Sequence, residues 1–214
     1  MKINIIYVVI CLIAGYGFGC FSTAYFIGKL HHIDLRKEGS GNLGTTNALR
    51  TLGKAAAAFT FIGDLLKAII PILVTRYIFR ENYDVSILMG MLTGFGVVLG
   101  HNFPFWLKFK GGKGIAVTAA VTLCIAHWPV VVAGLVVFVG IVAVTRYVSL
   151  GSLVSVFALP VNAILFHRSS EYFIIILAVS CLFAILAYVQ HRENIVRLIH
   201  GNERKIGEKK SENS

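Results

Sequence analysis

Long apolar segments separated by short polar loops set the strongest limit on how this chain can fold. Most of them reach the roughly 20 residues that a helix needs to cross a bilayer. We therefore predict an all-α polytopic membrane protein with about seven transmembrane helices and cytoplasmic polar loops. The fourth segment is short and begins in a glycine-rich loop, which predicts a half-helix or a strongly tilted helix. The approximate segments are 3–27, 55–79, 86–107, 114–127, 129–145, 149–167 and 171–189.

The composition agrees with a membrane protein and points to anionic partners. The chain is 57% hydrophobic and 14% charged, whereas soluble domains carry about a quarter charged residues. Its net charge of +10 favours phospholipid headgroups and phosphorylated metabolites. Nucleic acid is disfavoured because most basic residues lie in short loops between apolar segments.

The distribution of lysine and arginine predicts the orientation. With the N-terminus outside and seven spans, 15 basic residues lie on the inner side and 4 on the outer side, which favours a cytoplasmic C-terminus. The first apolar segment lacks a signal-peptidase site, so we interpret it as a retained transmembrane helix. We expect one integral membrane domain over 1–203 and a polar, mobile tail over 204–214.

A polar segment between the first two apolar segments, 38–50, has the composition of a phosphate-binding loop. Its glycines let backbone N–H groups turn toward a ligand. Arg50 is its only basic residue and can donate two hydrogen bonds to an anion. The same composition also fits a flexible linker between helices. The residues that we expect to bind substrate are Ser40, Asn42, Thr46, Asn47 and Arg50.

A second polar segment, 101–114, ends with three glycines around a lysine just before an apolar segment. A helix N-terminus with a lysine beside it is suited to an anion. The spacing does not match a Walker A loop, because no Ser or Thr follows Lys113. A basic interfacial anchor is the alternative. We select Lys108 and Lys113 as substrate-binding residues.

Two more polar segments fall on the predicted cytoplasmic side. The loop 146–152 carries two serines one helical turn apart, and the segment that leaves the last apolar run carries His, Asn and Arg on one helical face. The convergence of four polar segments on one side matters more than any of them alone. The candidates here are Ser149, Ser152, His191, Asn194 and Arg197.

Asp64 and Lys67 lie within the second apolar segment, three residues apart. Charges at that depth are costly unless they are paired or functional, and we expect an ion pair that faces the bundle. No DxD or HExxH signature is present, so we predict no metal and no cofactor.

Taken together, the segments 39–50, 109–114, 146–152 and 191–198 resemble the bacterial acyl-phosphate–glycerol-3-phosphate acyltransferase family over nearly the whole chain. The family usually has Ala where this chain has Thr45. The segment 201–205 matches the family's third motif less closely, so Glu203 and Lys205 are left out of the predicted site.

The resemblance implies an enzyme of the bacterial inner membrane that transfers a fatty acyl group from acyl phosphate to the 1-hydroxyl of sn-glycerol 3-phosphate. The products are lysophosphatidic acid and phosphate, in the first committed step of phospholipid synthesis. It also implies a functional link to an enzyme that produces acyl phosphate. By motif position, the resemblance implies that the site residues are Ser40, Arg50, Lys113, Ser152, His191 and Asn194. Of these we expect Ser152, His191 and Asn194 to be catalytic, and we add Ser149 to the substrate-binding set. The proton acceptor, chain-length preference and oligomeric state stay open.

The main alternative is a membrane transporter of phosphate or phosphate esters, since basic residues and broken helices also suit that role. A transporter should carry polar groups on both membrane faces and ideally two similar halves. This chain has one polar face and no repeat.

Overall fold

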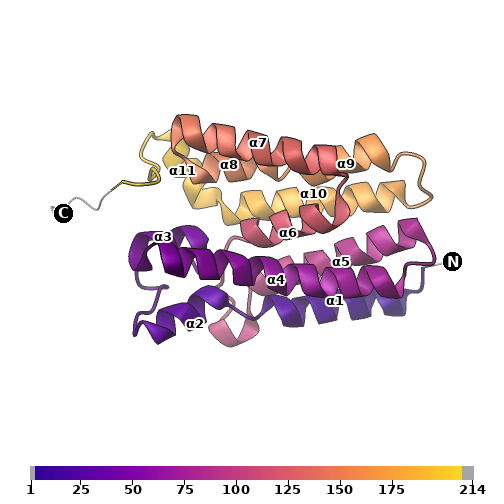
Figure 1. Ribbon diagram of the computed structural model, residues 1–214, viewed down its shortest axis with the longest axis horizontal. Coiled ribbons are helices and arrows are strands. Elements are labelled where there is room, and N and C mark those ends of the chain that lie inside the picture. The colour runs from indigo at the N-terminus through magenta and orange to yellow at the C-terminus, as the bar shows by residue number, and fades with distance from the viewer. Residues whose placement is uncertain (1–2, 209–214) are drawn as a thin grey trace.

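The computed structural model describes residues 3–208, which form helices joined by loops (Figure 1). The element order agrees with the predicted all-α class. The helices are α1 Ile5–Gly19, α2 Thr23–Leu30, α3 Thr45–Leu52, α4 Lys54–Ile78, α5 Tyr83–Asn102, the 3₁₀ helix η1 Phe105–Leu107, α6 Ile115–Ile125, α7 Trp128–Thr145, α8 Val148–Ser155, α9 Ala158–Phe166, α10 Phe173–Gln190 and α11 Arg192–Ile199.

Six segments of the described chain are long and apolar enough to cross a membrane, and α6 is the short seventh. With 11 residues and a rise of 1.5 Å per residue, α6 is about 16 Å long. The hydrocarbon core is about 30 Å thick, so α6 covers about half of it. This confirms the short fourth segment. The six long spans are Ile5–Leu30, Lys54–Ile78, Tyr83–Leu107, Trp128–Thr145, Val148–Phe166 and Phe173–Gln190.

Two segments predicted as continuous helices are each broken into two. The first breaks before α2, where the Ser22 side chain accepts a hydrogen bond from the backbone N–H of Tyr25 and caps the new helix. The second breaks between α8 and α9 at Val156 and Phe157. Pro160 explains this break because its ring clashes with the carbonyl four residues earlier. Apolarity alone does not reveal either break.

Helix α5 lies at the centre of the fold and packs closely on α1. A Cβ atom on Gly19 would lie 2.2 Å from the carbonyl oxygen of Val97, and one on Gly100 would lie 2.2 Å from that of Tyr16. The two backbones therefore touch at positions that only glycine allows. The outer helices expose large apolar side chains, such as Val144, which is 85% exposed, and lipid covers these surfaces in a membrane.

The polar segments gather at one end of the body. Figure 1 shows α3 and α11 at this end, and the start of α1 at the opposite end. The described ends of the chain thus lie on opposite sides, as an odd number of crossings requires. Which end faces the cytoplasm stays a prediction from the basic residues.

Candidate active site

A buried carboxylate, Glu203, connects two of the predicted polar segments. Its Oε1 accepts hydrogen bonds from Ser149 Oγ at 2.9 Å and from Asn194 Nδ2 at 2.7 Å. Its Oε2 accepts one from Arg197 Nε at 2.8 Å. Burial alone would raise the pKa of Glu203, but these hydrogen bonds outweigh it and lower the pKa. The carboxylate is therefore ionised at neutral pH.

Lys113 reaches the same cluster from the loop that precedes α6. Its Nζ donates to Asn194 Oδ1, so the Asn194 amide connects Lys113 to Glu203. The pKa of Lys113 is lowered to about 8, first because burial disfavours the ammonium and second because Arg197 is near. Lys113 still carries its proton at neutral pH.

Arg50, in the last turn of α3, joins this cluster from a third segment. Its Nη2 donates to the backbone oxygen of Arg204 at 3.3 Å. Arg50 is exposed, but partial desolvation and then the charge of Arg204 lower its pKa, while Glu203 opposes the change; arginine nevertheless stays charged in proteins. The charge of Arg50 also influences the pKa of Lys113. The cations Arg50, Lys113 and Arg197 therefore share one region with a single buried carboxylate, which gives a site suited to phosphate.

His191 lies between α10 and α11 and is buried beside this cluster. Its Nδ1 is 2.8 Å from the carbonyl oxygen of Ala187, and because a carbonyl only accepts, Nδ1 carries the proton. Nε2 therefore keeps its lone pair. Burial lowers the pKa of His191 to about 4, with the hydrogen bond to Ala187 opposing and the charge of Lys113 adding to the shift. The ring is neutral at physiological pH.

The segment 38–50, which we predicted as a loop, becomes helical at Thr45, and Asn47 lies in the first turn of this helix, α3. Its side chain holds the backbone of the residues that precede the helix. Its Oδ1 accepts from the Ser40 N–H at 2.8 Å, and its Nδ2 donates to the carbonyls of Leu35 at 3.0 Å and Glu38 at 3.1 Å. Both amide hydrogens are thus used. Asn47, which we predicted to bind substrate directly, has no side-chain N–H left for a ligand; it shapes the loop instead.

The other candidates of the 38–50 loop lie near the second glycine-rich loop. The Leu43 N–H is 3.5 Å from the Gly111 carbonyl oxygen, which brings the two loops into contact. Ser40 is exposed, whereas Asn42 and Thr46 are half-buried.

Two predicted residues are not joined to the cluster. The Ser152 Oγ donates to the Val148 carbonyl of its own helix at 2.8 Å and is buried. Lys108 is exposed, and within residues 3–208 no hydrogen bond or ion pair of its side chain is found. Of the candidates, the cluster therefore contains Arg50, Lys113, Ser149, His191, Asn194 and Arg197.

Comparison with known proteins places the chain in a family. The family model described as Glycerol-3-phosphate acyltransferase matches residues 9–201. The chain belongs to this family. A glycerol-3-phosphate acyltransferase of Clostridioides difficile (strain 630) is 41% identical over 206 residues, which cover 95% of this chain and 97% of the relative. One of Alkaliphilus metalliredigens (strain QYMF) is 44% identical over 201 residues, which cover 94% and 96%.

A solved structure agrees with this membership. The crystal structure of PlsY (YgiH), an integral membrane glycerol 3-phosphate acyltransferase, in its glycerol 3-phosphate form superposes with a TM-score of 0.80 and 33% identity. The match covers 94% of this chain and 96% of that chain. The resemblance read from the motifs is thereby confirmed, as is the fold of an integral membrane acyltransferase.

From the sequence we did not include Glu203 in the site, and we predicted that the tail begins at residue 204, which is too early. We expected a mobile tail from residue 204, yet Arg204 bonds to Arg50, and the Ile206 N–H donates to the Arg146 carbonyl at 2.8 Å. The Arg146 side chain donates back to the Ile206 carbonyl at 2.9 Å. The tail is thus attached through residue 206. Residues 209–214 lie outside the described residues.

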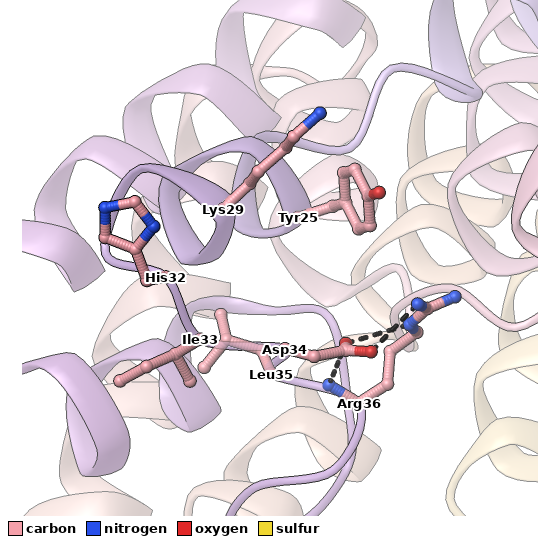
Figure 2. Close-up of a pocket in the computed structure, with 7 residues that line it drawn as sticks. All are labelled: Tyr25, Lys29, His32, Ile33, Asp34, Leu35 and Arg36. Carbon is pink, nitrogen blue, oxygen red and sulfur yellow. Dashed lines mark hydrogen bonds and ion pairs between the residues drawn. The ribbon is translucent and has the colours of Figure 1, made fainter.

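A surface hollow of about 310 Å³ is lined by α2 and by the residues that follow it, 32–36. Figure 2 shows that Arg36 in this hollow is paired with Asp34, with a 2.9 Å contact between Arg36 Nη2 and Asp34 Oδ2. None of the predicted site residues lines it. Among the described residues, no group of three or more His, Cys, Asp or Glu side chains is arranged to hold a metal.

Proposed function

We propose that this chain transfers a fatty acyl group from acyl phosphate to the 1-hydroxyl of sn-glycerol 3-phosphate. The products are lysophosphatidic acid and inorganic phosphate. The observation that carries the proposal is the shared location of Arg50, Lys113 and Arg197 around Glu203 at one end of a membrane-spanning helical body. Both substrates carry phosphate, and the donor also carries an apolar chain.

The chemistry needs alignment more than activation, because acyl phosphate is already an activated acyl group. The hydroxyl oxygen of glycerol 3-phosphate attacks the acyl carbonyl carbon, and the bond between that carbon and the phosphate oxygen breaks. Inorganic phosphate leaves with the proton. Cations held near the phosphates stabilise the charge that develops on them.

The cluster supplies these functions from different helices. Arg50 and Lys113 bind phosphate, and Asn194, fixed by Glu203, orients the Lys113 ammonium. Ser40 lies at the exposed rim of the first loop, where its hydroxyl can add a hydrogen bond to the same phosphate.

His191 orients the hydroxyl through the lone pair of Nε2. With a pKa of about 4, it is a weak base, far from the range in which a general base works well at neutral pH. The departing phosphate is the better proton acceptor. Ser152 already donates its O–H to Val148, so it can take part only as an acceptor, and a covalent acyl-serine is disfavoured.

An apolar hollow supports a donor with a long chain. It has a volume of about 340 Å³ and is lined by α7, α8 and α9, from Val154 to Phe166 and from Pro129 to Val137. Helix α8 also carries Ser149, which contacts Glu203. An acyl chain in this hollow would therefore lead along α8 to the polar cluster.

The location follows from the same reasoning. We place the protein in the bacterial inner membrane with the cluster on the cytoplasmic side, where glycerol 3-phosphate is available. An enzyme that produces acyl phosphate would supply the donor.

Phosphate release by purified protein in detergent tests the proposal. Palmitoyl phosphate is supplied with and without glycerol 3-phosphate, and lysophosphatidic acid is measured. Removing a charged hydrogen-bond partner costs about 1.5–3 kcal/mol, so Arg50→Ala and Lys113→Ala should each lower kcat/KM by about ten- to a hundredfold. Lys110→Ala is the matched control, because Lys110 is exposed in the same loop as Lys113.

Turnover without a sealed vesicle would exclude a pure transporter. A folded wild-type protein that releases no phosphate under these conditions would overturn the acyltransferase proposal and favour uptake of phosphate esters, measured in sealed vesicles.

A further inference from the structure

Three buried polar side chains form a second cluster, deeper than the phosphate-binding one. Asp64 and Lys67 come from α4, and His101 comes from α5; each is no more than 6% exposed. Lys67 Nζ contacts Asp64 Oδ1 at 2.9 Å, His101 Nδ1 at 2.7 Å and the Phe21 carbonyl oxygen at 2.8 Å. The predicted ion pair of Asp64 and Lys67 is confirmed, and it has a third member.

The contacts fix the proton on the His101 ring. A lysine ammonium only donates, so Nδ1 accepts from Lys67 and the ring proton lies on Nε2. Lys67 Nζ thus donates to His101 and to the Phe21 carbonyl and forms an ion pair with Asp64. In a continuous helix the Phe21 carbonyl would accept from the Tyr25 N–H. At the break between α1 and α2 that N–H donates to the Ser22 side chain, so the Phe21 carbonyl is available to Lys67.

The Nε2 edge of His101 faces the second glycine-rich loop. A Cβ atom on Gly112 would lie 2.0 Å from His101 Nε2, and one on Gly111 would lie 2.0 Å from the His101 carbonyl oxygen. That carbonyl accepts from the Gly112 N–H at 3.0 Å, and the Asn102 carbonyl accepts from the Gly111 N–H at 3.1 Å. His101 therefore bonds to this loop through its backbone carbonyl, and its ring packs directly against Gly112.

The loop held in this way carries the substrate-binding lysine. Lys113 follows Gly112 directly, and Leu43 of the first loop contacts the Gly111 carbonyl oxygen at 3.5 Å. A shift of the His101 ring would therefore move both phosphate-binding loops. The tight contact at Gly112 leaves no space in which the loop could move independently of the ring.

We propose that Asp64, Lys67 and His101 are positioning residues, which hold Gly111 and Gly112 so that Lys113 points at the substrate phosphate. They do not touch the substrate. A buried ion pair costs more in desolvation than an apolar replacement of the same size would, so a role in positioning accounts for its presence. The proposal rests on the proposed function and adds three residues to it.

His101→Asn separates positioning from folding. The Asn amide oxygen can replace Nδ1 as the acceptor for Lys67, but nothing replaces the ring edge at Gly112. A displacement of about 1 Å at a reacting group can cost on the order of a hundredfold in rate. We expect KM for glycerol 3-phosphate to rise at least tenfold, and the amide hydrogens of residues 111 and 112 to exchange faster with solvent.

Thr93→Val is the matched control. Thr93 on α5 bonds to Thr75 on α4 through their hydroxyl oxygens, 3.0 Å apart, and is fully buried. It therefore joins the same two helices without contacting the glycine-rich loop. We expect it to lower the melting temperature in detergent and to leave KM and the exchange at 111–112 unchanged.

Coupling between His101 and Gly112 gives a second test. Gly112→Ala should lower kcat/KM because the new Cβ meets the ring. Adding His101→Asn should then cost much less than it does in the wild type, since both changes act on one contact.

Two results would overturn the proposal: an unchanged KM in His101→Asn, or an exchange rate at 111–112 that stays at the wild-type value. Hydrogen exchange needs no substrate. If the wild type lacked turnover, the proposed function would fail, while the exchange measurement would still decide the role of the triad.

Discussion

Replacing Glu203 by Gln changes one atom of the side chain and tests whether a carboxylate is required at the centre of the site. Glu203 accepts three hydrogen bonds, two at Oε1 and one at Oε2. The amide oxygen can keep the pair from Ser149 and Asn194. Its NH₂ group would then face Arg197, which also only donates.

The loss can be estimated from this single contact. A hydrogen bond to a charged group contributes about 1.5–3 kcal/mol. The Arg197 side chain is 33% exposed, and water partly replaces the lost partner, so we expect about 1.5 kcal/mol, near the lower end of that range. For a chain of this length, this lowers the melting temperature by about 3–6 °C.

A shift in pH dependence should accompany the lower stability. The negative charge of Glu203 raises the pKa of Lys113, so its removal lowers that pKa below about 8. Lys113 then loses its proton at lower pH, and kcat/KM for glycerol 3-phosphate should begin to fall at lower pH than in the wild type.

Glu193→Gln is the control, because Glu193 approaches the same Arg197 at 3.9 Å but is 74% exposed. Exposed pairs of this kind contribute about 0.3–0.5 kcal/mol. Thermal unfolding in detergent and a pH series of initial rates compare the variants. Equal melting temperatures for Glu203→Gln and Glu193→Gln, or an unmoved alkaline limb, would refute the central role of the Glu203 carboxylate.

Three more predictions concern single side chains. In the wild type, kcat/KM for glycerol 3-phosphate should fall above pH about 8 as Lys113 loses its proton, and Lys113→Arg should remove this limb; a limb that persists belongs to another group. In His191→Gln the amide oxygen can take the place of Nε2 as an acceptor, so this variant should retain a higher kcat than His191→Asn. Equal losses would indicate a general base, because neither amide can accept a proton. Asn47→Asp loses both N–H donors and should destabilise the protein by about 1–3 kcal/mol, measured by thermal unfolding. Asn42→Asp is the control: the Asn42 side chain forms no hydrogen bond among the described residues, so this variant should have the melting temperature of the wild type.

The sequence was sufficient to predict that the polar segments converge. Lys113 and Asn194 are separated by 81 residues yet bond to each other, and Arg50 lies near them. The length of the apolar segments and the charge of the loops predicted this convergence. Each spanning helix carries the chain to the opposite side of the membrane, so alternate loops lie on the same side. Convergence required only the number of spans, not their packing.

The individual contacts could not be predicted in the same way. Asn42 and Asn47 are identical side chains five residues apart in one polar segment, but only Asn47, in the first turn of α3, donates to the carbonyls of Leu35 and Glu38. Glu203 lies in a polar stretch with no apolar periodicity, and it is buried only because α8 and α11 pack against it. Such partners depend on where distant backbone atoms come to lie, which a single sequence does not record.

The short length of α6 connects the fold to the chemistry. Because α6 is about half as long as the membrane is thick, the loop before it can enter the helical body. There Lys113 is half-buried and bonds to Asn194, while Lys110, three residues earlier, is exposed. A full-length helix would carry Lys113 out to water beside Lys110, where its charge would be screened. The short helix thus leaves Lys113 half-buried and bonded to Asn194, which is where the proposed function needs a cation for phosphate.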